Sequence, residues 1–193
     1  MAEIVLVGGI GMQSDKLIVI YGNKPRDMSY EIMSKADIKS LLYKGMKIAI
    51  KPNLVVAKPS NTGATTTPGL VEGIIRYLKD NGFSNITIME SSWIGDSTKR
   101  AYKVCGYEDL SRKYNIPLLD LKSDKTKTLS HNGFKMDICS SALETDFLIN
   151  VPVLKAHCQT QLTCALKNLK GCIPDNEKRR FHTLGLHDPI AVL

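Results

Sequence analysis

The 193-residue sequence lacks any apolar run of the roughly 18 residues that a membrane-spanning helix needs. Its first eleven residues carry Glu3, no basic region and only a short apolar run interrupted by glycine, which predicts a first strand and not a signal peptide. Five cysteines are scattered without a CxxC pair, which argues against a disulfide framework and for a reducing compartment. These absences predict a cytoplasmic protein with no membrane partner.

Aromatic residues are also scarce, at 6% of the chain, whereas lysine and arginine outnumber aspartate and glutamate by 26 to 19. The formal net charge of +7 favours anionic partners, such as small phosphates or carboxylates, nucleic acid or a membrane surface. A lysine-rich solvated surface would give the same net charge. The positions of particular lysines therefore have to decide between these interpretations.

Strand and helix signals alternate along the chain. Strands are expected at 3–7, 17–21, 46–50, 85–89, 117–121 and 147–151, and helices at 29–43, 68–81, 97–114 with a break at Gly106, and 159–170. Asn132-Gly133 predicts a hairpin over 129–138. The pattern predicts a single α/β domain over 1–193, with a mostly parallel sheet covered by helices and one antiparallel hairpin near 129–138.

Ligands of open α/β sheets bind beyond the carboxyl ends of the strands. This rule selects residues 51–53, 90–92 and 153–157 as the places where a site would form. Just beyond the first of them, Thr65, Thr66 and Thr67 precede an expected helix, whose N-terminus attracts anions through its dipole and unpaired N–H groups. Capping of the helix by Thr67 alone is the simpler alternative.

The expected helix at 159–170 has two distinct faces. Leucines and alanine form one face, expected in the core, and the opposite face bears Thr160, Thr163, Cys164 and Lys167, with Lys170 at its edge. A solvated face would usually mix acidic and basic residues, but this one has no acid. We therefore expect the wall of a site that binds an anion through Lys51, Asn53, Thr65, Thr66, Thr67, Thr163, Lys167, Asn168 and Lys170.

Lys155 and His157 follow the expected strand at 147–151 and are the candidate catalytic residues. Histidine titrates near neutral pH, so His157 is suited to proton transfer, although a structural histidine is the common alternative. Lys155 would bind phosphate or carboxylate, or act as a base or nucleophile if its pKa is depressed. The sequence does not choose between these roles.

Two other patterns carry weaker signals. The cysteines and histidines after residue 156 match no standard zinc or iron–sulfur spacing, so no metal site is assigned. The basic run Lys178-Arg179-Arg180 could contact nucleic acid, but no aromatic stacking platform accompanies it, and nucleic-acid binding ranks low. The glycine-rich segment at 8–11 precedes a strand signal and predicts a turn instead of a dinucleotide site.

Several ordered motifs resemble a bacterial and archaeal family, the "domain of unknown function 362". The segments that carry the resemblance are 51–55, 64–68, 149–157 and 162–171, and the similarity spans roughly 47–187. The family has no settled activity, and some members are fused to a ferredoxin-like module with two four-iron clusters. This chain lacks that cysteine pattern, so the resemblance implies a separate ferredoxin-like partner at most.

Family members usually continue beyond the point where this chain ends, so a fragment or a short variant is expected. A looser, fold-level likeness to the nickel-dependent lactate racemases draws attention to Lys155 and His157, because lysine and histidine serve the cofactor and proton transfer there.

The leading hypothesis is an enzyme that acts on a small anionic metabolite, with its cofactor unknown. An iron–sulfur or ferredoxin-associated redox protein is the first alternative, and a nucleic-acid-binding module is the second.

Overall fold

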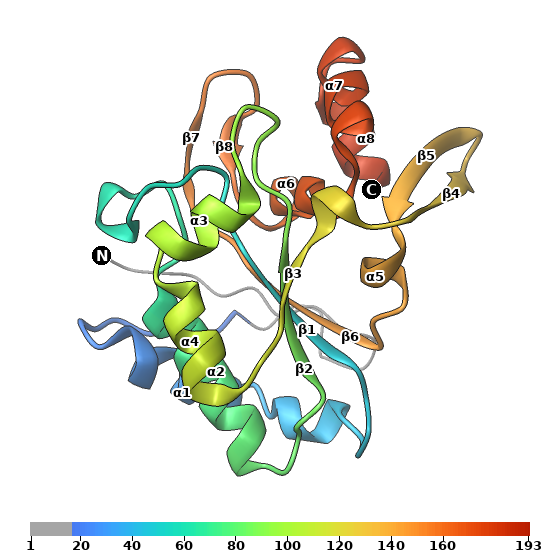
Figure 1. Ribbon diagram of the computed structural model, residues 1–193. Helices are drawn as coiled ribbons and strands as arrows, with labels where there is room; N and C mark the ends of the chain where they lie inside the picture. The colour runs from blue at the N-terminus through green and yellow to red at the C-terminus, as the bar shows by residue number, and fades with distance from the viewer. Residues whose placement is uncertain (1–16) are drawn as a thin grey trace.

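The computed structural model describes residues 17–193, and its centre is a four-stranded parallel sheet (Figure 1). The order of the strands is β3-β2-β1-β6. Their bounds are β1 Ile48–Pro52, β2 Ile86–Glu90, β3 Leu118–Asp120 and β6 Phe147–Val151. The predicted α/β class, with a mostly parallel sheet and helices against it, is confirmed.

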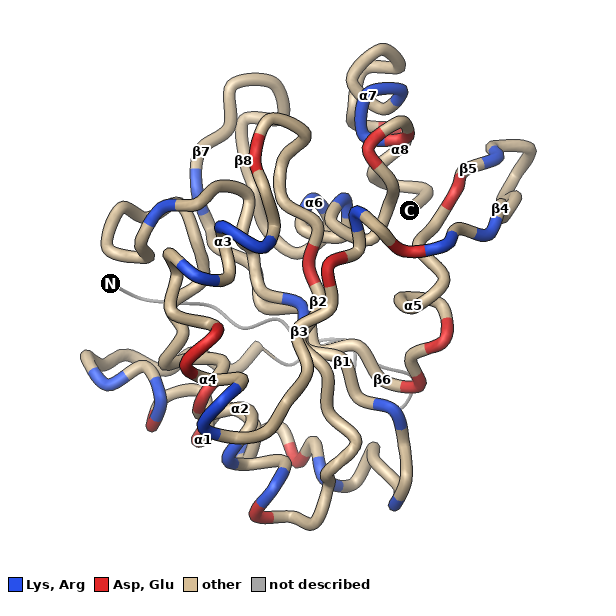
Figure 2. Tube along the Cα trace, viewed as in Figure 1, with Lys and Arg blue, Asp and Glu red and all other residues tan. Residues whose placement is uncertain are grey.

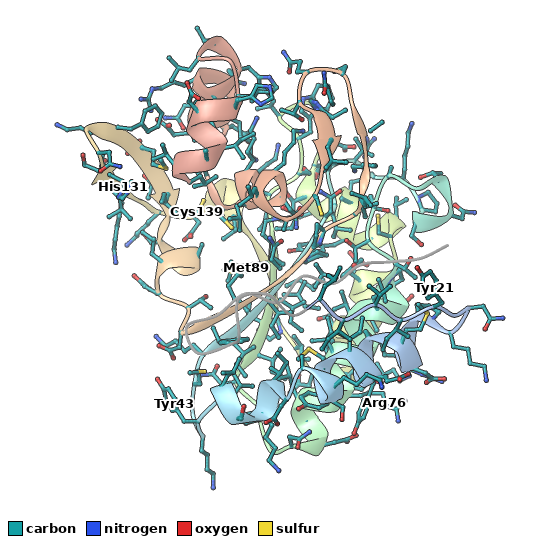
Figure 3. The ribbon with its side chains drawn as sticks, turned by 180° about the vertical axis from the view of Figure 1, so that it is seen from behind. Tyr21, Tyr43, Arg76, Met89, His131 and Cys139 are labelled. Carbon is teal, nitrogen blue, oxygen red and sulfur yellow. The ribbon has the colours of Figure 1, made fainter. Side chains whose placement is uncertain are left out.

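Four helices cover one face of the sheet: α1 Pro25–Lys35, α2 Pro68–Asp80, α3 Thr98–Val104 and α4 Tyr107–Tyr114. In β1, Ile48 and Ile50 pack against this layer, and Ala49 lies in a smaller cluster with Met89 and Cys139 on the opposite face. Every residue of β1 is buried. This burial explains why the central strand is continuously apolar up to Lys51. Figure 3, seen from behind, labels Met89 and Cys139.

Local signals set the helix ends as predicted in two places. Thr67 has the extended backbone of an N-cap residue, Pro68 begins α2, and Gly82 follows the helix with φ of 85°. Gly106, with φ of 78°, separates α3 from α4. Cβ-free glycine adopts this left-handed conformation without strain, which is why the predicted helical segment breaks there.

In the structure, the helix predicted at 29–43 begins earlier, at Pro25, and is shorter, ending at Lys35. Helix α1 starts at Pro25, which suits the first helical turn because it has no N–H to leave unpaired. Asp37 has a left-handed φ of 47°, and the chain continues as the 3₁₀ helix η1 Ile38–Leu41. The hydrophobic pattern continued through this break, so sequence periodicity alone did not locate it.

The predicted antiparallel hairpin is confirmed with slightly longer strands, β4 Thr126–His131 and β5 Phe134–Cys139. Asn132 and Gly133 both have positive φ, which matches the twist of a tight hairpin. The hairpin packs against the C-terminal helices α7 Asp175–Thr183 and α8 His187–Val192 through a second core cluster. The cluster contains Met136, Ile173, Phe181, Leu186 and Ile190.

The predicted helix at 159–170 is wrong. The chain there forms a second antiparallel hairpin, β7 Lys155–His157 and β8 Gln161–Thr163, followed by the short helix α6 Ala165–Asn168 and the 3₁₀ helix η4 Leu169–Cys172. Leu162 and Leu166, expected in the core, are exposed by 55% and 65%. Polar Asn168 is buried instead, because amide and carbonyl groups of β1 and β6 satisfy its side chain.

The predicted strand at 17–21 is also wrong, because those residues form no strand and Tyr21 is 79% exposed. Ile20 packs on Met28 and Ile32 of α1 instead. The predicted strand at 3–7 and the predicted turn at 8–11 lie outside the described residues. Short elements complete the description: η2 Ser60–Thr62, η3 Leu121–Ser123 and α5 Ser140–Leu143.

Helices α1 and α2 cross closely at Gly73, which suggests a test of the helical layer. A Cβ at this position would collide with the carbonyl oxygen of Arg26 and with Ser29 Oγ. Gly73→Ala should therefore lower the free energy of unfolding by roughly 1–3 kcal/mol, despite the better helix propensity of alanine. Urea denaturation would measure the change.

Gly69→Ala in the same helix is the matched control. Its Cβ would meet Pro25 Cγ at 3.1 Å, a contact that a small shift of the proline ring relieves. A Gly73→Ala variant as stable as Gly69→Ala would show that the close crossing of α1 and α2 is not required.

Candidate functional site

The three strand-end segments selected from the sequence meet at one edge of the sheet. A pocket of about 370 Å³ opens there, between the ends of β1 and β2 and the segments β7, β8, η4 and α7. In Figure 2, basic residues lie on β7, on α6 and on α7 around this edge. Most of the residues that line it have basic or neutral polar side chains: Asn53, Ser91, Ser92, Lys155, His157, Gln159, Thr163, Lys167, Asn168, Lys170, Lys178 and His182.

A buried ion pair, of which only Glu90 lines the pocket, lies beneath it. Lys51 is 0% exposed, and its Nζ lies 2.8 Å from Glu90 Oε1 and 3.1 Å from the carbonyl oxygen of Pro52. Glu90 also accepts hydrogen bonds from the backbone N–H groups of Leu54 and Ser91. Lys51 therefore neutralises Glu90, and it is not among the residues that line the pocket.

The backbone of η4 approaches this ion pair at Gly171. A Cβ on Gly171 would collide with Glu90 Oε1 and with Nζ of Lys51. Only glycine allows η4 to pass so close to the pair. The approach explains how a segment 120 residues after Lys51 in the chain becomes part of the pocket.

Three asparagine side chains connect the ion pair to the pocket wall. Asn53 Nδ2 donates to Asn168 Oδ1 at 2.8 Å, and Asn168 Nδ2 donates to Asn150 Oδ1 at 2.7 Å. The remaining oxygen, Asn53 Oδ1, accepts a hydrogen bond from Lys155 Nζ at 2.8 Å. Asn53 and Asn168, predicted to bind the anion, line the pocket and hold Lys155 in place.

The three threonines at 65–67 are not brought to the pocket wall. Thr65 Oγ1 donates to the carbonyl oxygen of Lys58, and Thr66 Oγ1 donates to that of Val151 while accepting from the N–H of Asn53. Thr67 occupies the N-cap position of α2. Their segment contributes the carbonyl oxygen of Ala64, which accepts a hydrogen bond from Lys155.

Four lysines line the pocket, and three of them were predicted from the sequence as site residues. Lys155, Lys167 and Lys170 belong to the segment assigned to the site. Lys178 was placed in a candidate nucleic-acid run, but α7 turns it inward, where Nζ binds the carbonyl oxygens of Ser91 and Ser92 and Asp175 Oδ1. The four-residue spacing of Lys178 and His182, which places both on one helix face, was the signal that could have found it.

Burial of these amines weakens their hold on protons. Burial lowers the pKa of Lys155 to about 8, and the neighbouring Lys167 adds to the shift. Burial likewise lowers the pKa of Lys170 to about 8, helped by Lys167 and Lys178. Each lysine is thus partly neutral near pH 8, and an anion in the pocket would restore the charged form.

His157 is held as a neutral ring with a defined proton. Its Nδ1 accepts hydrogen bonds from the backbone N–H groups of Gln159, at 3.1 Å, and Thr160, at 3.2 Å. The proton of the neutral ring must therefore lie on Nε2. Burial and then the nearby Lys167 lower the pKa of His157, which favours this neutral form. His157 can donate a hydrogen bond through Nε2, but its basic nitrogen is occupied.

His182 of α7 is oriented across the mouth of the pocket by two polar contacts. Its Nδ1 lies 2.9 Å from Gln159 Oε1, and its Nε2 lies 3.2 Å from Lys170 Nζ. A charged Lys170 can only donate, so Nε2 accepts and Nδ1 carries the proton toward Gln159. Burial and then Lys170 lower the pKa of His182. His182 was not selected as a site residue from the sequence.

Thr163 is the one predicted threonine in the pocket wall. The residue is 3% exposed, and Oγ1 is buried without a hydrogen-bond partner within residues 17–193. A buried hydroxyl without a partner is costly and needs an explanation. Thr163 lines the pocket, so this unsatisfied hydroxyl lies next to the cavity.

The cysteines take different positions. Cys105, Cys139 and Cys172 are buried, and burial raises the pKa of Cys139 to about 12 and that of Cys172 to about 11. Cys158 is exposed and lines the pocket. Among the described residues, no three or more His, Cys, Asp or Glu side chains gather in a way that could hold a metal ion.

The basic run at 178–180 does not form one exposed surface. Lys178 is buried, whereas the Arg180 guanidinium stacks on Phe134 at 4.9 Å and pairs with Glu177 at 2.8 Å. Of the three basic side chains, Arg179 is the exposed one. This arrangement offers no continuous basic face to a nucleic acid.

Comparison with known proteins identifies the class: the chain belongs to the family "domain of unknown function (DUF362)", whose model matches residues 48–193. The resemblance inferred from the motifs is thereby confirmed. A relative, "Thylakoid-associated protein sll1697" of Synechocystis sp., is 27% identical over 138 residues. This alignment covers 72% of the chain and 42% of the relative, so the chain spans less than half of that protein's length. No solved structure matches the chain.

In the part of the chain from residue 17 onward, no helix has the length and apolar character that crossing a membrane requires. The cytoplasmic location inferred from composition stays a prediction.

The buried pair between Lys51 and Glu90 should contribute to the free energy of unfolding, and this contribution can be tested. Lys51→Met would leave the Glu90 carboxylate buried without its main partner, and the free energy of unfolding should fall by roughly 3–5 kcal/mol. Glu90→Gln should be destabilising for the converse reason. The double variant should lose less than the sum of the two single losses, because it leaves no unpaired buried charge. Chemical denaturation of all four proteins would measure the coupling, and simple additivity would show that the pair does not act as a unit.

Proposed function

We propose that the protein is an enzyme that acts on a small anionic metabolite, a carboxylate or a phosphate, in the pocket at the sheet edge. One observation carries this proposal: of the four lysines that line the pocket, Lys178 is paired with Asp175, whereas Lys155, Lys167 and Lys170 have no carboxylate partner among the described residues, and the single lining carboxylate, Glu90, is already paired with Lys51. Such a wall has unmet positive charge, which an anionic ligand would neutralise.

The pocket residues would divide the work by their geometry. Lys167 and Lys170 would bind the anion as point charges, and Thr163 Oγ1 would donate to one of its oxygens. His157 would donate a hydrogen bond from Nε2 as a neutral ring, which suits a group that develops negative charge. Lys155, partly neutral near pH 8, would be the group that accepts a proton or attacks the substrate.

Lys51, Thr65, Thr66 and Thr67 would then support the site without contacting the anion. The redox alternative stays a prediction, because no contact among the described cysteines favours it.

Thr163 gives the sharpest test of anion binding. Thr163→Val removes a buried hydroxyl without a partner, so the variant should be as stable as the wild type or slightly more stable. If the hydroxyl binds the anion, affinity should fall roughly tenfold, as expected for loss of a hydrogen bond to a charged group. Isothermal titration with inorganic phosphate and with pyruvate would measure affinity, and thermal melting would measure stability.

Lysine variants complete this experiment. Lys170→Met should weaken binding of both anions, whereas Lys99→Met, a change of an exposed lysine on α3, should not. Equal affinities for the wild type, Thr163→Val and Lys170→Met would contradict the proposed site.

Anion binding should also be linked to proton uptake. Lys155 and Lys170 have pKa values lowered to about 8, and a bound anion raises them again, so the complex takes up protons near pH 8. Affinity should therefore fall as the pH rises from about 7 to about 9, with up to about one proton taken up per anion at about pH 8 and more at higher pH. Titrations in two buffers of different ionisation enthalpy would give that number. A pH-independent affinity with no proton uptake would contradict the role of these amines.

Catalysis itself can be tested without knowing the natural substrate. A panel of hydroxy acids, oxo acids and phosphate esters would be incubated with the protein in D₂O and followed by proton NMR. Turnover or deuterium incorporation should depend on Lys155 and be reduced in His157→Phe. Binding of anions without any chemical change across the panel would favour a binding protein over an enzyme.

A further inference from the structure

Lys155 has an unusual set of partners for a lysine in a polar pocket. The two hydrogen bonds of its Nζ go to neutral oxygens, Asn53 Oδ1 at 2.8 Å and the carbonyl oxygen of Ala64. No carboxylate among the described residues forms an ion pair with Lys155, whereas Lys51 and Lys178 each have one. The amine is therefore positioned firmly but receives little stabilisation of its positive charge.

The same two contacts fix the direction of the lone pair when the amine is neutral. A neutral primary amine has two N–H bonds, and Asn53 and Ala64 accept one each. The lone pair then occupies the remaining tetrahedral position, away from both acceptors. The Lys155 side chain lines the pocket, and attack of the amine on a bound molecule requires that this position face the cavity.

Burial keeps part of the Lys155 population neutral. Burial lowers the pKa to about 8 and Lys167 reinforces this effect, while Glu90 opposes it. About a tenth of the amine is then neutral at pH 7, far more than for an ordinary lysine with a pKa near 10.5. A lysine of this kind is suited to attack a carbonyl carbon.

We propose that Lys155 forms an imine with a small molecule that carries a carbonyl group beside a carboxylate, that is, a 2-oxo acid. This inference rests on the proposed anion pocket and names the substrate class for it. Lys167 and Lys170 would bind the carboxylate, and the carbonyl carbon would face Lys155 Nζ. His157 Nε2–H would donate to the carbonyl oxygen as negative charge develops there.

The step is balanced without an oxidant or reductant. The lone pair of Nζ attacks the carbonyl carbon, a C–N bond forms, and the π electrons of the C=O bond move to oxygen. A proton passes from nitrogen to that oxygen to give a carbinolamine. Loss of the hydroxyl group as water, with a proton from solvent, leaves a protonated imine, whose positive charge replaces that of the lysine ammonium.

Borohydride trapping of the whole 193-residue chain tests the proposal. The protein would be incubated with pyruvate near pH 7.5, reduced with sodium borohydride, digested and mapped by mass spectrometry. We expect one 1-carboxyethyl group, the product of imine reduction, on Lys155, on the order of tenfold or more above exposed Lys99, because the pocket would hold the carbonyl carbon beside Lys155 Nζ. Inorganic phosphate, an anion without a carbonyl group, should suppress the adduct by competition.

Lys155→Arg is the matched variant, because it keeps the positive charge but cannot form an imine. It should melt like the wild type, still bind phosphate, and give no adduct in the pocket. Adducts concentrated on Lys167 or Lys170, or no adduct above the background at Lys99, would overturn the assignment to Lys155.

Binding measurements separate this failure from failure of the proposed function. If titration shows that pyruvate and phosphate bind but no adduct forms on Lys155, the imine is wrong and the anion pocket stands. If neither anion binds the wild type and no adduct forms, both proposals are wrong.

Discussion

The buried ion pair between Lys51 and Glu90 is the constraint on which the site depends. Two charges without solvent cost several kcal/mol each unless every lone pair and proton is satisfied. Here the carboxylate accepts from Lys51 Nζ and from two backbone N–H groups, while Lys51 also donates to the carbonyl oxygen of Pro52. Meeting these demands fixes the ends of β1 and β2 relative to each other. It also draws η4 in at Gly171, the position where a side chain would not fit.

This pair determines the electrostatics of the pocket above it. The charge of Glu90 is paired with Lys51, and its remaining attraction for Lys155 only partly opposes the lowering of the pKa of that lysine. Burial first, and neighbouring lysines second, lower the pKa values of Lys155 and Lys170 to about 8. The asparagine chain from Asn150 through Asn168 and Asn53 to Lys155 transmits the position of the sheet to the amine without adding charge. The pairing of Lys51 with Glu90 therefore both fixes the base of the pocket and leaves Lys155 and Lys170 without a carboxylate partner within residues 17–193.

The predictions that proved right depended on local chemistry. Strand signals at 147–151, the cap residues of α2, and Asn132-Gly133 each specify a backbone conformation by their own steric and hydrogen-bonding preferences. The helix predicted at 159–170 was wrong because it, too, was inferred from a local pattern. Its apolar residues recur with helical spacing, but Leu162 and Leu166 have no core to face, and the chain instead buries Asn168. Periodicity reports which residues could share a face, and only the rest of the fold decides whether that face is buried.

The sequence by itself determined the α/β class, the parallel sheet, the edge at which the pocket opens and the presence of Lys155, His157, Thr163, Lys167 and Lys170 near that edge. These follow from strand order and from residues close to strand ends. Tertiary structure alone decided that Lys51 is neutralised by Glu90 and that Lys178 and His182 enter the pocket. It also placed the proton of His157 on Nε2, through the N–H groups of Gln159 and Thr160. The physical reason is that burial, pairing and tautomer depend on which distant groups come within hydrogen-bonding distance, and a linear pattern does not specify those distances.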